Sequence, residues 1–380
     1  MIIAIDGALP HGRELFSDLG EVRLFAGKEL KPDDLRDVNA LIVRTVTPVN
    51  AALLEGSAVT FVGAASAGVD HVDQEYLANK GIHFYYAAGC NADAVSEYIL
   101  TALYTVAARR NWTLAEKSLA VVGVGNVGSR VARKARALGM NVLLCDPPLR
   151  EKTGDSQYQP FESVLNADIL TFHVPLVAAG DYPTLRMVNR EIIAGLSPQQ
   201  FLINSSRGEI FDNRELLSAL REKRISGAIL DVWEGEPEID YSLLRYADIG
   251  TPHIAGTTLD GKIKAVSMIS EYLRRFSGVV SSPRADDFYP AIKTIRPAAG
   301  TTRQNAAASV LRQVCLIDED DAGLRALENL PEKDRGKSFE QLRTRHVLRP
   351  EFPHFLVELN AQQSDLAGVF QGMGFQNGLI

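Results

Sequence analysis

Three polar residues, Arg207, Glu236 and His253, each follow one of three successive apolar runs in the second half of the chain. These runs are predicted to be parallel strands, and loops after the carboxyl ends of such strands line the crevice where ligands bind. The three side chains are therefore predicted to face one crevice. An imidazole, a carboxylate and a guanidinium gathered in this way are suited to oxidising a secondary alcohol by hydride transfer.

Each of the three side chains has a distinct role in that chemistry. His253 would take the hydroxyl proton, because histidine titrates near neutral pH. Glu236 would hold the imidazole in one tautomer and favour its charged form. Arg207 would bind a substrate carboxylate through its planar fork of donors and stabilise charge on the reacting oxygen. A lone residue of any of these types is more often structural, so the prediction depends on their joint position.

A glycine-rich turn indicates the redox partner. It follows the apolar run at 119–122 and opens a helical stretch at 129–138. In that setting the first glycine makes a tight turn, the second lets backbone approach a pyrophosphate, and the third lets helix pack on strand. The pyrophosphate then lies at the helix N-terminus. The predicted cofactor-binding residues of the turn are Gly123, Gly125, Asn126, Val127 and Gly128.

Asp146 ends the next apolar run, at 141–145. A carboxylate at the end of the second strand can bind the ribose hydroxyls of the adenosine, and it would repel a 2′-phosphate. The sequence therefore predicts NAD rather than NADP as the cofactor.

Apolar runs alternate with helical patterns in two parts of the chain, which predicts an α/β fold. Residues 96–257 are predicted to form an NAD-binding domain with a Rossmann-type doubly wound parallel sheet. Residues 1–95, completed by 258–280, are predicted to form a smaller, flavodoxin-like α/β substrate domain. Residues 281–380 lack this rhythm and are predicted to be an α+β module. The expected strands are 2–5, 40–43, 59–62, 82–85, 119–122, 141–145, 169–172, 201–204, 228–232 and 248–250.

Two longer stretches have the apolar spacing of helices. The first, at 96–109, is expected to link the two α/β units. The second, at 260–276, is expected to return the chain to the first unit, with Asp260 as a candidate N-cap.

Composition excludes several classes of function. The net charge of −7 and the pI of about 5.6 give no support for nucleic-acid binding. Three scattered cysteines favour a reducing cytoplasm without a disulfide framework. The sequence contains no CxxC or HExxH motif, so no metal site is predicted, and it has no signal-peptide pattern and no apolar run of membrane-spanning length.

With these residues in place, the chain resembles the D-isomer-specific 2-hydroxyacid dehydrogenases. The resemblance covers about residues 40 to 260 and rests on several motifs that are jointly specific. Apart from the glycine turn, they are Val43-Arg-Thr-Val-Thr47, Ser66-Ala-Gly-Val-Asp70, His173-Val-Pro175, Ser206-Arg-Gly208, Leu230-Asp-Val-Trp233, Glu236-Pro237 and Pro252-His-Ile-Ala-Gly256.

The resemblance implies roles for further residues. His173 and Val174 would line the adenosine side of the cofactor, and Asp231 would contact its nicotinamide end. Ser205, Ser206 and Gly256 are also expected to contact the cofactor. Substrate contacts are expected from Thr45, Ser66, Ala67, Gly68 and Thr257, the last at a position where the family is expected to carry a tyrosine.

Further motifs resemble those of one branch of that family, which oxidises a phosphorylated four-carbon 2-hydroxy acid in vitamin B6 synthesis. They include Gly89-Cys-Asn-Ala92, Cys145-Asp-Pro-Pro148 and Leu259-Asp-Gly-Lys262. The branch also adds a C-terminal dimerisation domain, so residues 281–380 are expected to make a homodimer. Two alternatives remain open: a dehydrogenase for another hydroxy acid, such as 3-phosphoglycerate, and a non-catalytic regulator that senses NAD(H).

A distal phosphate on the substrate would need its own cations, because Arg207 is occupied by the carboxylate. Arg44 is the nearest candidate, although it could instead bind the carboxylate. A second candidate is a C-terminal cluster, which a partner subunit could supply: Arg343, Arg345, His346 and Arg349.

Overall fold

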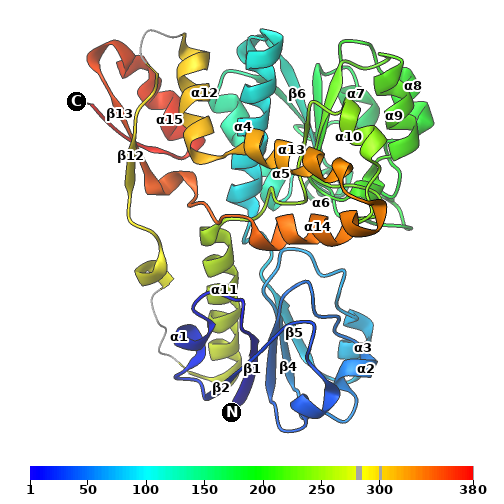
Figure 1. Ribbon diagram of the computed structural model, residues 1–380, viewed down its shortest axis with the longest axis vertical. Helices are drawn as coiled ribbons and strands as arrows, with labels where there is room; N and C mark the ends of the chain where they lie inside the picture. The colour runs from blue at the N-terminus through cyan, green and yellow to red at the C-terminus, as the bar shows by residue number, and fades with distance from the viewer. Residues whose placement is uncertain (280–284, 299–301, 380) are drawn as a thin grey trace. The chain divides into compact units, whose positions relative to one another are not determined.

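The computed structural model describes residues 1–279, 285–298 and 302–379 (Figure 1). The chain divides into two compact units. The smaller unit contains Met1–Asn91 and Thr258–Ala291, and the larger unit contains Ala92–Thr257 and Ile292–Ile380. The predicted boundary at Ser281-Ser282-Pro283 lies outside the described residues.

The smaller unit is built on a parallel sheet with the strand order β2-β1-β3-β4-β5. This is the flavodoxin-like order 2-1-3-4-5, as predicted. Its strands are β1 (Ile2–Asp6), β2 (Glu21–Phe25), β3 (Ala40–Val43), β4 (Phe61–Ala64) and β5 (His83–Tyr86). Its α-helices are α1 (Gly12–Phe16), α2 (Ala51–Leu54), α3 (Gln74–Asn79) and α11 (Leu259–Ser277).

Helix α11 shows how an amphipathic sequence completes this unit. Its apolar stripe, formed by Ile263, Val266, Ile269 and Leu273, is fully buried. The predicted cap was wrong: Thr258 is the N-cap, and its hydroxyl accepts the Gly261 N–H at 3.0 Å. Asp260 already lies inside the first turn and is buried.

The larger unit contains a parallel sheet with the strand order β7-β6-β8-β9-β10-β11. A single bridge between Leu144 and Tyr158 adds a reduced strand beyond β7. In chain order this gives the 3-2-1-4-5-6 arrangement of a Rossmann sheet, extended by β11, which confirms the predicted fold. The strands are β6 (Ser118–Val122), β7 (Asn141–Cys145), β8 (Ile169–Phe172), β9 (Phe201–Asn204), β10 (Gly227–Leu230) and β11 (Ile249–Gly250).

Both faces of this sheet are covered, because successive strand side chains point to opposite faces. Leu119 and Val121 of β6 join one apolar cluster, whereas Ala120 and Val122 join another. The α-helices of this part are α4 (Ala92–Arg110), α5 (Asn126–Ala137), α6 (Pro147–Thr153), α7 (Phe161–Val164), α8 (Arg190–Gly195), α9 (Asn213–Arg221) and α10 (Tyr241–Tyr246).

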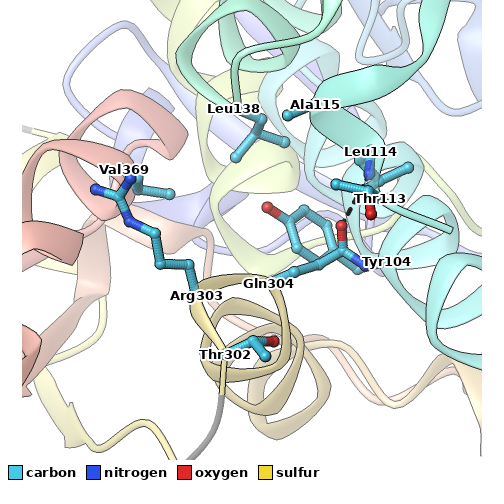
Figure 2. Close-up of a pocket in the computed structure, with 9 residues that line it drawn as sticks. All are labelled: Tyr104, Thr113, Leu114, Ala115, Leu138, Thr302, Arg303, Gln304 and Val369. Atoms are coloured by element: carbon cyan, nitrogen blue, oxygen red, sulfur yellow. Dashed lines mark hydrogen bonds between the residues drawn. The ribbon is translucent and has the colours of Figure 1, made fainter. Parts of the chain in front are cut away.

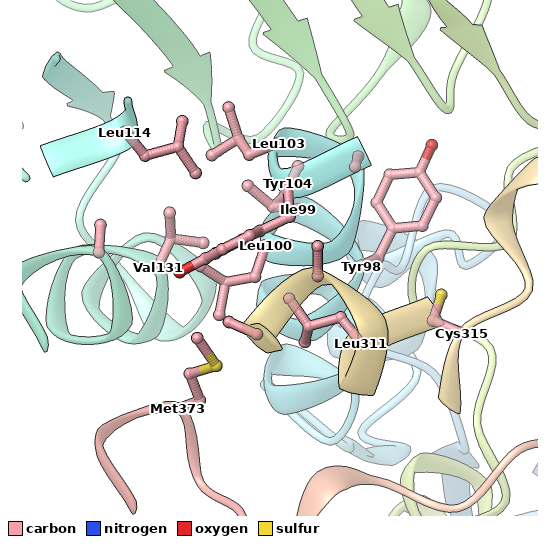
Figure 3. Close-up of a cluster of buried hydrophobic side chains, with 14 of the residues drawn as sticks. Tyr98, Ile99, Leu100, Leu103, Tyr104, Leu114, Val131, Leu311, Cys315 and Met373 are labelled. Atoms are coloured by element: carbon pink, nitrogen blue, oxygen red, sulfur yellow. The ribbon is translucent and has the colours of Figure 1, made fainter. Parts of the chain in front are cut away.

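The C-terminal segment shares a core with the Rossmann part of the larger unit (Figure 3). Leu311, Cys315 and Met373 of this segment belong to the same buried cluster as Leu100 and Val131 of α4 and α5. The segment contains a parallel sheet in the order β12-β13-β14. Its elements are β12 (Lys293–Ile295), α12 (Arg303–Val314), α13 (Ile317–Ala326), α14 (Glu332–Arg345), β13 (Phe355–Leu359), α15 (Ala367–Met373) and β14 (Gln376–Leu379).

Candidate active site

The structure brings two of the predicted catalytic residues into contact. Nδ1 of His253 lies 2.8 Å from Oε2 of Glu236, and the other carboxylate oxygen of Glu236 accepts the Trp233 N–H at 2.9 Å. These residues lie in the loops after β10 and β11, which are neighbouring parallel strands. The contact confirms that the two loops meet at one edge of the sheet.

The environment of Glu236 favours its ionised form. Burial opposes ionisation, but the hydrogen bond and charge of His253 outweigh it, with further help from the Trp233 N–H and from Arg343. The pKa of the Glu236 carboxyl therefore lies below its usual value. An ionised Glu236 can only accept a hydrogen bond, so Nδ1 of His253 carries the proton and Nε2 is left as the base.

Asp231 holds the loop that carries His253. Its buried carboxylate accepts the Thr251 hydroxyl at 2.6 Å and the Ile254 and Ala255 N–H groups at 2.8 and 3.0 Å. His253 itself has a φ of 55°, a left-handed conformation that is rare for a residue with a side chain and that these bonds hold in place. The expected contact of Asp231 with a nicotinamide stays a prediction.

Arg207 lies in the loop after β9, at the N-cap of a short 3₁₀ turn. Its Nη1 donates to the Ser206 carbonyl at 2.8 Å, and Asn204 Nδ2 donates to the Arg207 carbonyl at 2.9 Å. The next residue is Gly208, where a Cβ would lie 2.0 Å from the Trp233 carbonyl carbon. Glycine is needed there because the Arg207 loop lies directly against the loop that leads to Glu236.

The glycine turn has the geometry that a dinucleotide needs. Gly123 has a φ of +85°, and a Cβ there would lie 2.7 Å from the His173 carbonyl oxygen. At Gly128 a Cβ would lie 1.9 Å from the Gly123 carbonyl oxygen, so helix α5 packs tightly on the turn. Gly125 faces open space within 4 Å of its Cβ position and has no side chain to cap the first N–H groups of α5. The turn therefore offers unhindered backbone donors to an anion.

Asp146 lies at the end of β7, but it also has structural partners. Its two carboxylate oxygens accept the N–H groups of Val124, at 2.8 Å, and Leu149, at 2.9 Å. The carboxylate thus ties the glycine turn to the first turn of α6. Each oxygen keeps a second acceptor position, so a ribose hydroxyl could still bind.

The other predicted cofactor-binding residues differ in whether their polar groups are already hydrogen-bonded within the protein. Desolvation lowers the pKa of His173 to about 3, so its ring is neutral, and Nε2 lies 3.0 Å from the Thr171 hydroxyl. The buried hydroxyl of Ser205 has no hydrogen-bond partner among the described residues, as expected for a group that awaits a ligand. The Ser206 hydroxyl is already bonded to Asn204 Oδ1 at 2.9 Å. Val174 and Gly256 are half-buried.

The smaller unit places two cations near one another. Nε of Arg44 lies 2.9 Å from Oδ2 of Asp6, whose side chain is buried. Burial lowers the pKa of Lys262, and the positive charge of Arg44 lowers it further. Among the ion pairs of the described residues, Asp6 is the carboxylate that pairs with Arg44, and the effect of Arg44 on Lys262 shows positive charge that would attract an anion. Sequence reasoning missed Lys262, although a lysine in the first turn of a helix opposes the helix dipole and was a usable signal.

The remaining predicted substrate residues form loops of both units. In the smaller unit Thr45 is exposed, and the Ser66 hydroxyl donates to the Gly68 carbonyl at 2.7 Å. Ala67 and Gly68 are half-buried. Thr257 ends the loop of His253 in the larger unit, where its N–H donates to the Ile254 carbonyl at 2.8 Å.

The C-terminal cationic cluster is not a single site. Arg349 donates to buried Glu97 at 2.5 Å, and the second oxygen of Glu97 accepts the Phe352 N–H at 2.8 Å. This Arg349 guanidinium therefore stabilises the core, which argues against a role in phosphate binding. His346 pairs with Asp320 at 3.2 Å, and Arg345 is exposed.

Two cavities in the larger unit lie apart from the predicted catalytic side chains. One, of about 450 Å³, is lined by Tyr104 of α4, the segment 113–115, Leu138, the start of α12 and Val369 of α15 (Figure 2). The other, of about 550 Å³, lies between α13, α14 and Pro252.

The described residues contain no group of three His, Cys, Asp or Glu side chains that could hold a metal. Among the described helices, none is both long and apolar enough to cross a membrane.

Known proteins share both the sequence and the fold. The protein-family model for the NAD-binding domain of D-isomer specific 2-hydroxyacid dehydrogenases matches residues 98–255 of this chain. Erythronate-4-phosphate dehydrogenase of Escherichia fergusonii is 41% identical over 359 residues, which cover 94% of each protein. The enzyme of the same name from Escherichia coli strain SMS-3-5 is also 41% identical over 359 residues.

Solved structures give the same fold at lower identity. D-lactate dehydrogenase from Aquifex aeolicus, complexed with NAD and lactic acid, has a TM-score of 0.60 and 24% identity and covers 73% of this chain and 96% of its own. NAD-dependent formate dehydrogenase from Staphylococcus aureus, in complex with NAD, has a TM-score of 0.57 and 20% identity over 74% of this chain and 99% of its own. At these identities the likeness supports the fold alone.

Proposed function

The chain belongs to the erythronate-4-phosphate dehydrogenases, a family within the NAD-dependent D-isomer specific 2-hydroxyacid dehydrogenases, and we propose that it oxidises 4-phospho-D-erythronate at C2. The product is 3-hydroxy-2-oxo-4-phosphooxybutanoate, a 2-oxo acid on the route to pyridoxine 5′-phosphate. The observation that carries this proposal is the 2.8 Å contact between His253 and Glu236, at the carboxyl-end edge of the parallel sheet where the glycine turn after β6 also lies. The three buried cysteines, none of them in a disulfide, agree with a cytoplasmic location.

The proton of the C2 hydroxyl passes to Nε2 of His253. Because Glu236 accepts a hydrogen bond from Nδ1–H, its negative charge stabilises the imidazolium that forms. Arg207 binds the C1 carboxylate and the C2 oxygen, so that the developing carbonyl dipole faces a fixed cation.

NAD, when bound, supplies the acceptor for the hydride that leaves C2. The alcohol thus loses one hydride and one proton, and its C–O bond becomes a carbonyl. The residues that would hold NAD are the glycine turn, Asp146 and the hydroxyl of Ser205, whose missing partner a bound nucleotide would provide.

An absorbance assay for NADH tests the proposed substrate directly. The substrates are 4-phosphoerythronate, erythronate and 3-phosphoglycerate, each with NAD and the full-length protein. We expect kcat/KM to be highest for 4-phosphoerythronate. A higher kcat/KM for 3-phosphoglycerate would identify that compound as the substrate instead. Binding of NADH without turnover of any of the three compounds would indicate a regulator.

Asp146 is expected to set the preference for NAD over NADP. In Asp146→Asn the charge is lost, and the amide oxygen can accept only one of the two backbone N–H groups that the carboxylate accepts. The ratio of kcat/KM with NAD to kcat/KM with NADP should fall roughly five- to tenfold, because a contact between two charges in water is worth ~1 kcal/mol. Asp155→Asn, an exposed neighbour, is the control. Equal use of NAD and NADP by the unmodified protein would contradict this role.

We propose that the chain forms a homodimer through the C-terminal segment. The segment exposes apolar side chains, with Val347 82% and Leu316 50% accessible. Deleting the segment is a poor test, because its side chains complete the core of the larger unit. Sedimentation of the full chain at micromolar concentration should show a dimer, and Val347→Glu should shift it to monomer without changing its secondary structure by circular dichroism. A monomeric unmodified protein would exclude the dimer.

A further inference from the structure

Helix α14 of the C-terminal segment lies against the loop that carries Glu236. Gly336 of this helix is buried, and a Cβ there would lie 2.3 Å from Glu238 Oε1 and 3.5 Å from Pro237 Cγ. A side chain at this position would meet the tip of the exposed Glu238 side chain, which can move aside, and would touch Pro237 at ordinary contact distance. Helix α14 therefore packs directly on the residues that follow Glu236.

Arg343 lies seven residues after Gly336 and so on the same face of α14. Its Nη1 is 4.0 Å from Oε2 of Glu236, the same oxygen that lies 2.8 Å from Nδ1 of His253. The guanidinium is also 3.2 Å from Oε1 of Glu340, one turn earlier in the helix. Arg343 thus stands between a carboxylate of its own helix and the carboxylate of the catalytic pair.

We propose that Arg343 is a positioning residue for the proposed oxidation: α14 holds its guanidinium beside Glu236, where it restrains the carboxylate and limits how strongly Glu236 stabilises protonated His253. The inference rests on the proposed function. Its physical basis is that a cation near Glu236 attracts the carboxylate and repels an imidazolium. Neutral His253, the form that accepts a proton from substrate, is thereby favoured.

Other charges around the pair come from the elements packed against it. Asp231 lies at the end of β10, and its own carboxylate is engaged by the His253 loop. Glu234 is paired with Arg186 at 2.8 Å. The charged groups on the packed elements are Asp231, Glu234, Glu238, Arg186 and, in the neighbouring loop, Arg207. Helix α14 carries Glu332, Lys333, Asp334, Arg335, Lys337, Glu340, Arg343 and Arg345. Arg343 lies within ion-pair distance of the shared oxygen of Glu236.

The test is an NMR titration of the His253 ring in the full chain, labelled with ¹³C-histidine and assigned by comparison with His253→Ala. In Arg343→Gln the midpoint of the His253 resonance should move to higher pH by roughly 0.5–1 unit, less than a directly adjacent charge causes, because Arg343 contacts Glu236. In Glu340→Gln it should move to lower pH, because an anion has been removed and Arg343 is free to approach Glu236.

Two variants separate a charge effect from a loss of structure. Arg343→Lys keeps the cation and should restore most of the original midpoint. Arg335→Gln changes a charge on the same helix, where Arg335 donates to the Glu328 and Leu330 carbonyls, and should leave the midpoint unchanged. Equal midpoints in Arg343→Gln and the unmodified protein would overturn the inference, and so would equal shifts in Arg343→Gln and Arg335→Gln.

The titration does not need turnover, so it is independent of the proposed substrate. Where 4-phosphoerythronate is oxidised, the acid limb of kcat/KM should follow the same shift to higher pH in Arg343→Gln. An inactive unmodified protein would contradict the proposed function while the titration still decides the role of Arg343.

Discussion

In the His253→Ala variant, turnover of 4-phosphoerythronate is expected to fall by roughly 10²–10⁴-fold, the usual contribution of a general base. The methyl side chain can neither take the hydroxyl proton nor pair with Glu236. Affinity for NAD should change little, because the proposed nucleotide contacts of the glycine turn and Asp146 do not involve His253. Steady-state turnover and a separate titration of NAD binding by intrinsic fluorescence would measure the two effects.

The control for this variant is His83→Ala, which removes an exposed histidine of the smaller unit and should keep normal turnover. Added imidazole should restore part of the activity of His253→Ala, because it can enter the vacated space and act as the base. Turnover close to that of the unmodified protein in His253→Ala would refute the assignment of the base.

The parts of the fold that the sequence predicts well are those set by local pattern. Buried parallel strands are continuous apolar runs, so β3, β6, β7, β8 and β9 lie at or within one residue of their predicted positions. Edge strands are harder, because one side of the strand faces solvent and the apolar run is broken. Strand β2 was missed for this reason, since Glu21 and Leu24 are exposed. Strand β4 begins two residues later than predicted.

The candidate site was predictable where its residues follow strands, because the topology alone brings strand ends together. His253 and Glu236 are such a pair. The contribution of α14 was not predictable, since Arg343 reaches Glu236 only through the packing of the C-terminal segment on the larger unit. Glu97 could have predicted the structural role of Arg349, because a carboxylate within the apolar stretch of α4 needs a buried cation as its partner.

Arg44→Ala is expected to lower kcat/KM for 4-phosphoerythronate by roughly 10- to 100-fold, the effect of losing a charged hydrogen bond worth ~1.5–3 kcal/mol. We propose that Arg44 and Lys262 bind the distal phosphate, because together they carry more positive charge than Asp6 neutralises. A dianionic phosphate would relieve the repulsion between the two cations. For erythronate, which lacks the phosphate, the same substitution should change kcat/KM far less.

Arg44→Ala also leaves buried Asp6 without its partner, so a general loss of structure must be separated from a loss of phosphate binding. Lys262→Ala makes that separation, because it removes the second cation while the pair of Arg44 and Asp6 stays intact. Lys264→Ala, on the same helix α11, is the matched control and should leave both substrates unaffected. Equal losses on phosphorylated and plain erythronate in Arg44→Ala would refute a phosphate-binding role for Arg44. The ratio of the two kcat/KM values therefore decides whether this arginine binds the phosphate, because a lost carboxylate contact or misfolding lowers both values together and only a phosphate ligand changes one alone.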